Sequence, residues 1–112
     1  MQPPPGWFPK RGEVYLAQLD KPRPVLVLSI DALNANSFDV CVVPITSIEH
    51  RKFVLRVPIK TGDARLDRDC WAKCDQVTTL EKSLLRYPAL GMLSATVFVT
   101  IQTQVKRALG LI

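Results

Sequence analysis

The sequence has few of the side chains from which metal centres and disulfide frameworks are built. Its 112 residues include three cysteines and a single histidine, His50. The cysteine count is odd, and no two cysteines follow the C-x-x-C pattern typical of zinc sites. We therefore expect no disulfide, no bound metal and no cofactor, as is usual for a protein of a reducing compartment.

Long apolar runs are also missing. No segment approaches the roughly 20 consecutive apolar residues that a membrane-spanning helix requires. Residues 1–6 lack the basic and then apolar pattern of an export signal. We therefore expect a cytoplasmic protein that has no membrane partner.

Basic side chains are in excess. Fifteen Lys and Arg against ten Asp and Glu give a formal net charge of +5, and the sequence pI is about 9.4. Such a surplus favours a polyanionic partner. The solvated surface of an ordinary basic protein explains it equally well, so charge alone leaves both interpretations open.

Hydrophobic periodicity predicts a mainly β domain over residues 10–112, preceded by a proline-rich lead at residues 1–9 whose Trp7 and Phe8 dock onto it. Ser94 is expected to begin a C-terminal helix, and Gly110 to end it. A terminal helix added to many short strands is typical of a small barrel or sandwich. The strands are expected at residues 13–19, 23–30, 38–46, 53–58, 69–77 and 85–93.

Other segments have weaker signals. Residues 31–36 are expected to form a turn or one helical turn with Asp31 as the N-cap. Residues 60–69 are expected to form a loop, and residues 78–82 a turn that leads into a short helical piece.

Polar side chains gather at three predicted strand ends. Arg23 stands between two prolines at the start of one strand, and Thr46 and Ser47 follow the apolar end of another. The third segment, residues 70–76, runs from a strand into charged and amide side chains. Guanidinium and hydroxyl groups at such positions can bind phosphate oxygens, so we expect the chain to bring these ends together.

Several fragments, in order, resemble the MazF/PemK (Kid) family of toxins, the mRNA interferases of bacterial toxin–antitoxin pairs. The resemblance covers roughly residues 10–111. Each fragment is weak alone, but their order and spacing make the set specific. The fragments are residues 11–15 (RGEVY), 23–29 (RPVLVLS), 43–47 (VPITS), 74–80 (CDQVTTL), 91–94 (GMLS) and 108–111 (ALGL).

The resemblance implies a small SH3-like barrel of the CcdB/PemK type with a C-terminal helix. It implies a homodimer and a metal-independent, sequence-selective endoribonuclease that cleaves single-stranded mRNA. It also implies a cognate antitoxin whose disordered acidic tail covers the RNA groove. None of these properties follows from composition or periodicity.

Carried over by position, the resemblance predicts Arg23, Thr46 and Asp75 as catalytic residues. Metal-free cleavage requires deprotonation of the ribose 2′-OH, stabilisation of the phosphorane charge and protonation of the leaving oxygen. Arg23 suits charge stabilisation because its planar fork matches phosphate oxygens. We further predict that five residues bind RNA: Ser47, Lys73, Glu13, Gln76 and Arg51.

Each residue has a structural alternative. Thr46 and Ser47 are also suited to satisfying local backbone, Asp75 to forming a turn, and Glu13 to orienting Arg23. His50 lies in a polar loop, so we interpret it as a solvated residue. The cysteines Cys70 and Cys74 are expected to be small buried side chains, not ligands.

Two departures from the family pattern leave other functions open. Only residues 20–22 separate the first two strands, where relatives often have a long loop that in some members carries a histidine. Lys73 stands where one branch has arginine. A catalytically weakened RNA-binding module is therefore an alternative. A gyrase-inhibiting toxin on the same fold is another, although the aromatic expected near the end of its terminal helix is missing after Phe98.

Overall fold

The fold is a curled antiparallel sheet with one long C-terminal helix. The computed structural model describes residues 1–49 and 55–112. The strands in chain order are β1 (Glu13–Gln18), β2 (Pro22–Val27), β3 (Asp39–Thr46), β4 (Arg56–Ile59), β5 (Cys70–Lys73), β6 (Thr78–Glu81) and β7 (Gly91–Met92). The helices are α1 (Asp31–Asn36) and α2 (Ala95–Ala108), with short 3-10 turns η1 (Asp63–Arg65) and η2 (Lys82–Leu84).

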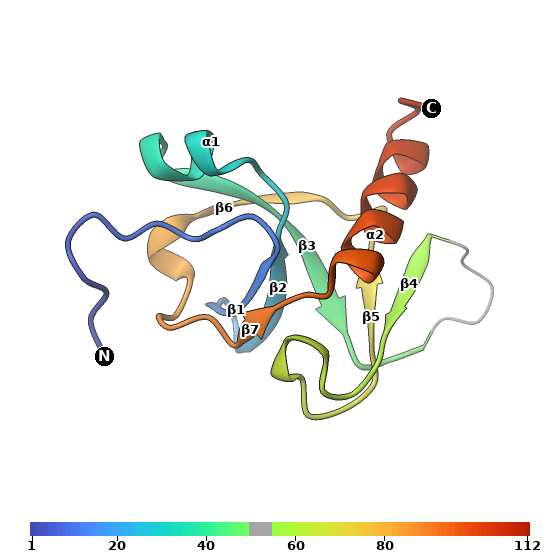
Figure 1. The fold of residues 1–112 in the computed structure, drawn as a ribbon, viewed down its shortest axis with the longest axis horizontal. Helices are drawn as coiled ribbons and strands as arrows, with labels where there is room; N and C mark the ends of the chain where they lie inside the picture. Colours follow the sequence, from blue (N-terminus) through green and yellow to red (C-terminus); the bar gives the residue numbers. More distant parts are fainter. Residues whose placement is uncertain (50–54) are drawn as a thin grey trace.

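Strand β3 organises the sheet. The strand order is β4-β5-β3-β2-β1-β7, with β6 also paired to β3. The first half of β3 pairs with β6, whereas Ile45 and Thr46 pair with β5. Pro44, which has no N–H to donate, lies between these two stretches. Strand β3 therefore changes its pairing partner along its length, and the sheet curls there. In Figure 1, β3 runs through the centre of the molecule.

Both faces of the sheet are buried. Alternation along β1 sends Val14 into one apolar cluster and Tyr15 and Ala17 into another. Helix α2 covers the first cluster through Ile101 and Val105 (Figure 1). This arrangement agrees with the predicted mainly β barrel-like fold with a C-terminal helix, in the form of an open, curled sheet.

Helix α2 begins and ends where the sequence predicts. Ser94 is the N-cap residue, but its backbone N–H and hydroxyl both donate to the Asp63 carboxylate, at 2.9 and 2.7 Å. At the other end Gly110 has a φ of 72°. Gly110 N–H donates to the Arg107 carbonyl and Leu111 N–H to the Lys106 carbonyl, which is the Schellman arrangement. At the first end, the two hydrogen bonds from Ser94 to Asp63 tie the loop that carries Asp63 to the start of α2.

Several predicted boundaries are wrong. The strand predicted at residues 69–77 ends at Lys73, and residues 74 and 75 form a turn. The segment predicted as a turn, residues 78–82, begins with strand β6, because β3 offers it a free edge. Asp31 is not the N-cap of α1; Ile30 is, and the Asp31 carboxylate accepts a hydrogen bond from Arg11 N–H. Part of the strand predicted at residues 53–58 lies outside the described residues.

The proline-rich lead packs on the sheet. Trp7 makes edge-to-face contacts with Tyr15 and Tyr87, at centroid distances of 6.0 and 5.8 Å. Pro9 is fully buried. The expected docking of Trp7 is thus confirmed. Within the described ranges, no helix has the length and apolar character needed to span a bilayer.

Candidate functional site

A groove of about 880 Å³ lies beside the ends of β2, β3 and β5. We call it the basic groove. Five of its lining side chains are cationic, and Asp67 is the acidic one among the described residues. The cations are Lys21, Arg23, Arg65, Arg68 and Lys73. A concave surface with this excess of positive charge favours an anionic ligand.

Strand pairing explains why these side chains meet. Val25 of β2 pairs with Pro44 of β3 in antiparallel register, so the start of β2 lies beside the end of β3. Thr46 pairs with Trp71 of β5, which places β5 on the other edge of β3. Arg23, Thr46, Ser47 and Lys73 consequently line one groove. The expectation that three strand ends come together is confirmed for these four residues.

Arg23 is held by a neighbour. Its Nε and Nη2 donate to the two carboxylate oxygens of Asp20, both at 3.1 Å. The hydrogen bond from Arg23 lowers the pKa of Asp20 to about 2, so the carboxylate stays ionised at neutral pH. The two side chains are 47% and 71% exposed, so solvent screens the pair and it adds little stability. Asp20 therefore orients the fork and occupies the donors that a phosphate would use.

The two hydroxyl residues differ in exposure, because Thr46 is half-buried and Ser47 is exposed. The Thr46 hydroxyl accepts a hydrogen bond from Ile48 N–H at 3.1 Å, which is the local backbone contact given above as the alternative to catalysis. This contact leaves the hydroxyl proton of Thr46 free to donate. Ser47 is exposed at the rim of the groove. Thr46 is thus held in place while it keeps a donor.

Lys73 and Asp75 do not share a face. Because β5 ends at Lys73, the alternation that would place Asp75 beside it stops. Asp75 and Gln76 are exposed, and neither lines the groove. Gln76 N–H donates to the Lys73 carbonyl at 3.0 Å, which closes the turn. Arg56 lies opposite Lys73 on β4, so a second cation is close to Lys73.

Comparison with known proteins identifies the family. The model of the PemK-like, MazF-like toxins of type II toxin–antitoxin systems matches residues 10–109. The chain is 32% identical to the endoribonuclease MazF of Staphylococcus epidermidis over 111 residues, which covers 91% of this chain and 92% of that protein. The chain belongs to this toxin family.

Solved structures of similar fold include an endoribonuclease from a mycobacterial species, at 29% identity and a TM-score of 0.79, with 93% of each chain covered. Another is a mycobacterial endoribonuclease in complex with its cognate antitoxin, at 28% identity and a TM-score of 0.77. The match covers 91% of this chain and 93% of that one. Both likenesses extend over nearly the whole toxin.

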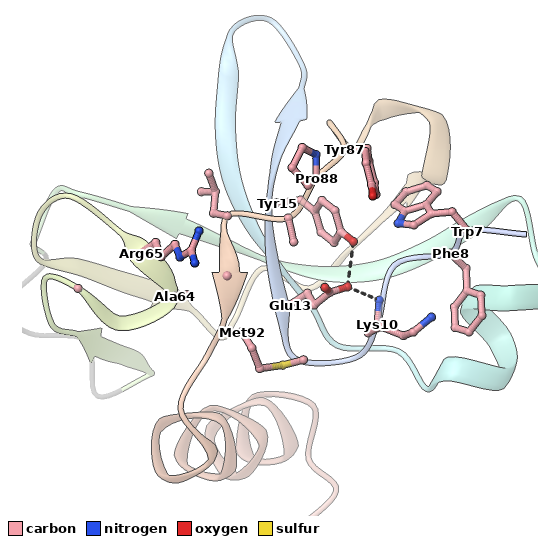
Figure 2. A pocket seen from close by; sticks show the side chains of 14 residues that line it. Trp7, Phe8, Lys10, Glu13, Tyr15, Ala64, Arg65, Tyr87, Pro88 and Met92 are labelled. Atoms are coloured by element: carbon pink, nitrogen blue, oxygen red, sulfur yellow. Dashed lines mark hydrogen bonds between the residues drawn. The ribbon is translucent and has the colours of Figure 1, made fainter. Parts of the chain in front are cut away.

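Glu13 lies away from the basic groove. It lines a second cavity of about 600 Å³, which we call the aromatic recess. The recess is lined by residues Trp7, Phe8, Lys10, Glu13, Tyr15, Gly62, Ala64, Arg65, Tyr87, Pro88, Ala89, Leu90, Gly91 and Met92 (Figure 2). Glu13 therefore does not orient Arg23. Arg51 and His50 lie outside the described residues.

Sequence reasoning missed three residues of the toxin's groove wall. Lys21 follows Asp20 in the short turn, and Arg65 and Arg68 come from the loop that was expected only to be polar. The signal in the sequence was the pair of arginines within four residues. The direction in which these two arginine side chains leave the loop depends on the loop conformation, because Ala64 and Arg65 both have positive φ, 51° and 59°.

Two of the cysteines are core side chains. Cys70 and Cys74 are buried, as expected for small apolar residues. Burial raises the pKa of the Cys74 thiol to about 12, so the thiol stays protonated at neutral pH. The described ranges contain no group of three or more His, Cys, Asp and Glu that could hold a metal ion.

Proposed function

We propose that this MazF-like toxin is a metal-independent endoribonuclease that cleaves single-stranded mRNA in the cytoplasm. The observation that carries the proposal is the convergence of Arg23, Thr46, Ser47 and Lys73 in one basic groove. The activity is the one named for its Staphylococcus epidermidis relative. The RNA backbone lies along the groove, and the 2′-OH attacks the adjacent phosphate.

Each groove residue has a role that its geometry supports. Arg23 leaves Asp20 and pairs with the scissile phosphate, where its charge stabilises the phosphorane. The Thr46 hydroxyl accepts a hydrogen bond from Ile48 N–H and donates a hydrogen bond to a phosphate oxygen. Ser47 and Lys73 bind the neighbouring backbone. Asp75 stays a predicted proton acceptor on sequence grounds alone, and Asp75→Asn tests it.

The chemistry is tested on a long single-stranded RNA with purified protein in excess EDTA. Cleavage is expected to persist, and the new 5′ ends are expected to accept label from a polynucleotide kinase without phosphatase treatment. That result identifies 5′-hydroxyl ends, which 2′-OH attack leaves. Loss of cutting in EDTA that magnesium restores would contradict the proposal. Binding without cleavage would favour the weakened RNA-binding module.

We propose two protein partners. Two copies of the toxin form a homodimer whose two-fold interface the RNA groove crosses. The support on the monomer is the set of exposed apolar side chains at and beyond α2, namely Val99, Leu109, Leu111 and Ile112. Light scattering at micromolar concentration should give twice the 12.5 kDa mass of one chain.

The second partner is a cognate antitoxin with a disordered acidic segment, the kind of partner named for the mycobacterial relative. Its carboxylates occupy the basic groove in place of phosphates, so antitoxin and RNA compete. The test is a titration of antitoxin against RNA bound to the Arg23→Ala protein at low and high salt. RNA binding should fall steeply with salt, and antitoxin binding should fall less because apolar anchors contribute. Simultaneous binding without loss of affinity would exclude a shared groove.

A further inference from the structure

The aromatic recess adjoins the basic groove. Arg65 and Leu90 line both cavities, so the two cavities are neighbours on either side of these residues. The recess is formed by the lead before β1, by β1 itself, by the segment before β7 and by the loop that carries η1 (Figure 2). None of the strand ends proposed for catalysis contributes to it.

Glu13 supplies the anionic group of the recess. Figure 2 shows its carboxylate between the Tyr15 hydroxyl and the backbone nitrogen of Lys10. Both donate to Oε1, at 2.9 and 2.6 Å. Among the described residues, none donates to Oε2. Oε1 is therefore saturated and held in place, and Oε2 of this half-buried residue is left as the acceptor without a donor in the described part of the chain.

Aromatic rings lie on one side of Glu13 in the recess (Figure 2). Trp7 stands nearly perpendicular to Tyr15 and Tyr87, with interplanar angles of 75° and 84°. Phe8 lies under the Lys10 ammonium group, which is 3.3 Å from the ring centroid. Tyr15 is fully buried, whereas Trp7 and Tyr87 are half-buried and line the recess, so a flat ligand can contact these two rings.

The backbone conformation places Arg65 between the two cavities. Ala64 and Arg65 have left-handed φ values, which side chains other than glycine rarely adopt. The loop is locked from two directions. Asp63 accepts two hydrogen bonds from Ser94, and the Gly91 backbone comes so close that an added Cβ would lie 2.8 Å from the Ala64 carbonyl carbon. Strain of this kind, maintained by packing, fixes the backbone of Arg65, whose exposed side chain lines both the groove and the recess.

We propose that the aromatic recess binds the guanine base of a nucleotide next to the phosphate held in the basic groove. The proposal rests on the proposed function and adds a base-reading site to it. Guanine presents two adjacent donors, N1–H and the N2 amino group, to a carboxylate. Adenine and cytosine place an acceptor beside their amino donor, and uracil places a carbonyl on each side of its N–H. The open oxygen of Glu13 therefore matches guanine best, and Arg65 binds the linking phosphate.

An acidic peptide fits the recess less well. The carboxylates of such a peptide would be repelled by the negative charge of Glu13. Its backbone offers one N–H per residue, whereas guanine offers two adjacent donors to the Glu13 carboxylate. Continuity with the basic groove also favours a segment of the same RNA chain. Binding of the antitoxin in the recess is therefore an outcome of the test that would overturn the proposal.

The experiment uses full-length protein carrying Arg23→Ala and a set of RNA tetranucleotides that differ at one base. Calorimetry should show guanine preferred over uracil by about tenfold at one position, the scale of one good base contact. Adding Glu13→Gln, which replaces the open acceptor with an N–H₂ donor, should remove this preference. Glu81→Gln changes the net charge equally, lies on β6 outside both cavities, and should keep the preference.

Two further measurements test the proposal if the Glu13→Gln protein unfolds at too low a temperature for calorimetry. A tetranucleotide with 6-thioguanosine at the preferred position should cross-link, on irradiation, to the peptide that contains Trp7 or Tyr87. Arg65→Asn, a residue that tolerates positive φ, should weaken every tetranucleotide and reduce the salt slope by about one without changing base preference.

The outcomes separate the two proposals. Equal affinity for all bases, cross-links confined to the groove, or Glu13→Gln weakening antitoxin but not RNA would overturn the recess assignment. Cleavage by the wild-type toxin together with any of these results would leave the proposed function standing. A guanine preference without cleavage by the wild-type protein would support the recess and contradict the enzyme.

Discussion

The basic groove and the aromatic recess share Arg65 and Leu90 but place charge differently. Five cations line the groove, and a neighbouring carboxylate, Asp20, holds Arg23. In the recess, one carboxylate is held among aromatic rings. Phosphate contacts position an RNA chain, whereas base-edge contacts select its sequence. The two cavities have the chemistry that these two tasks require.

The comparison extends to how each cavity is built. The groove is formed by strand ends whose positions follow from antiparallel register. The recess depends on a locked loop and on the lead, which packs through Trp7. Substitutions in the groove should therefore change activity with little effect on folding, whereas substitutions around the recess should affect both.

The largest effect is expected from Arg23→Ala. Loss of the guanidinium should lower the cleavage rate by at least about 100-fold, the scale for removing a group that stabilises transition-state charge. The side chain is exposed, so the melting temperature should hardly change. Single-turnover cleavage and thermal melting measure the two quantities. Arg107→Ala on α2 removes the same charge outside both cavities, and equal losses in the two variants would mean that the groove is not the site.

Thr46→Val should have a smaller effect on cleavage. The isosteric change removes one hydrogen-bond donor near the phosphate, which should lower the rate by between about tenfold and about a thousandfold and by less than Arg23→Ala. RNA affinity of the variant should stay close to that of the wild type. Thr100→Val on α2, where the hydroxyl bonds the Thr96 carbonyl, is the control. A Thr46→Val protein that cuts at the wild-type rate would exclude a catalytic role for the hydroxyl.

Gly91→Ala tests whether the recess depends on its locked loop. The new methyl group would lie 2.8 Å from the Ala64 backbone, so the loop must shift. Overpacking of this kind lowers the free energy of unfolding by about 1–3 kcal/mol. Thermal melting measures the loss, and the guanine preference should weaken with it. Gly110→Ala strains the backbone at a φ of 72° without a clash and outside both cavities, so it should lower the stability and keep the preference; a loss of preference there as well would point to a general loosening of the fold.

Asp20→Asn should have the smallest effect. Solvent screens the exposed pair, so its removal should tighten RNA binding only slightly, by no more than about fivefold. The pKa of Asp20 is lowered to about 2, so the pair is complete above the ordinary aspartate range and is lost only as the pH falls toward 2. Between pH 5 and 8 the variant's advantage should therefore stay constant, as fluorescence titration can measure. An advantage that grows toward acid pH would contradict the assigned contact.

Much of the fold could be predicted because its signals are local. The apolar alternation of β1, the apolar run of β2 and the Ser94 and Gly110 signals of α2 all lie within their own segments. The failures have non-local causes. Strand β6 exists because β3 offers it an edge, and β5 stops at Lys73 because a turn follows.

The site shows the same division. Arg23, Thr46, Ser47 and Lys73 were found from residue type, position at strand ends and resemblance to a family, and the structure brings them together. Asp75 and Gln76 were found in the same way, and the structure leaves them on an exposed turn. Glu13 was expected to act near Arg23, yet it lies in a different cavity.

The sequence by itself determined the family, the mainly β character, the terminal helix and four residues of the groove, namely Arg23, Thr46, Ser47 and Lys73. These depend on periodicity, caps and ordered fragments, which neighbouring residues encode. Only the tertiary structure decided that Arg65 lines two cavities and that Trp7, Tyr15 and Tyr87 line the same recess as Glu13. Each of these depends on strand register, a left-handed loop and the packing of distant segments, and such contacts form only when the chain is folded.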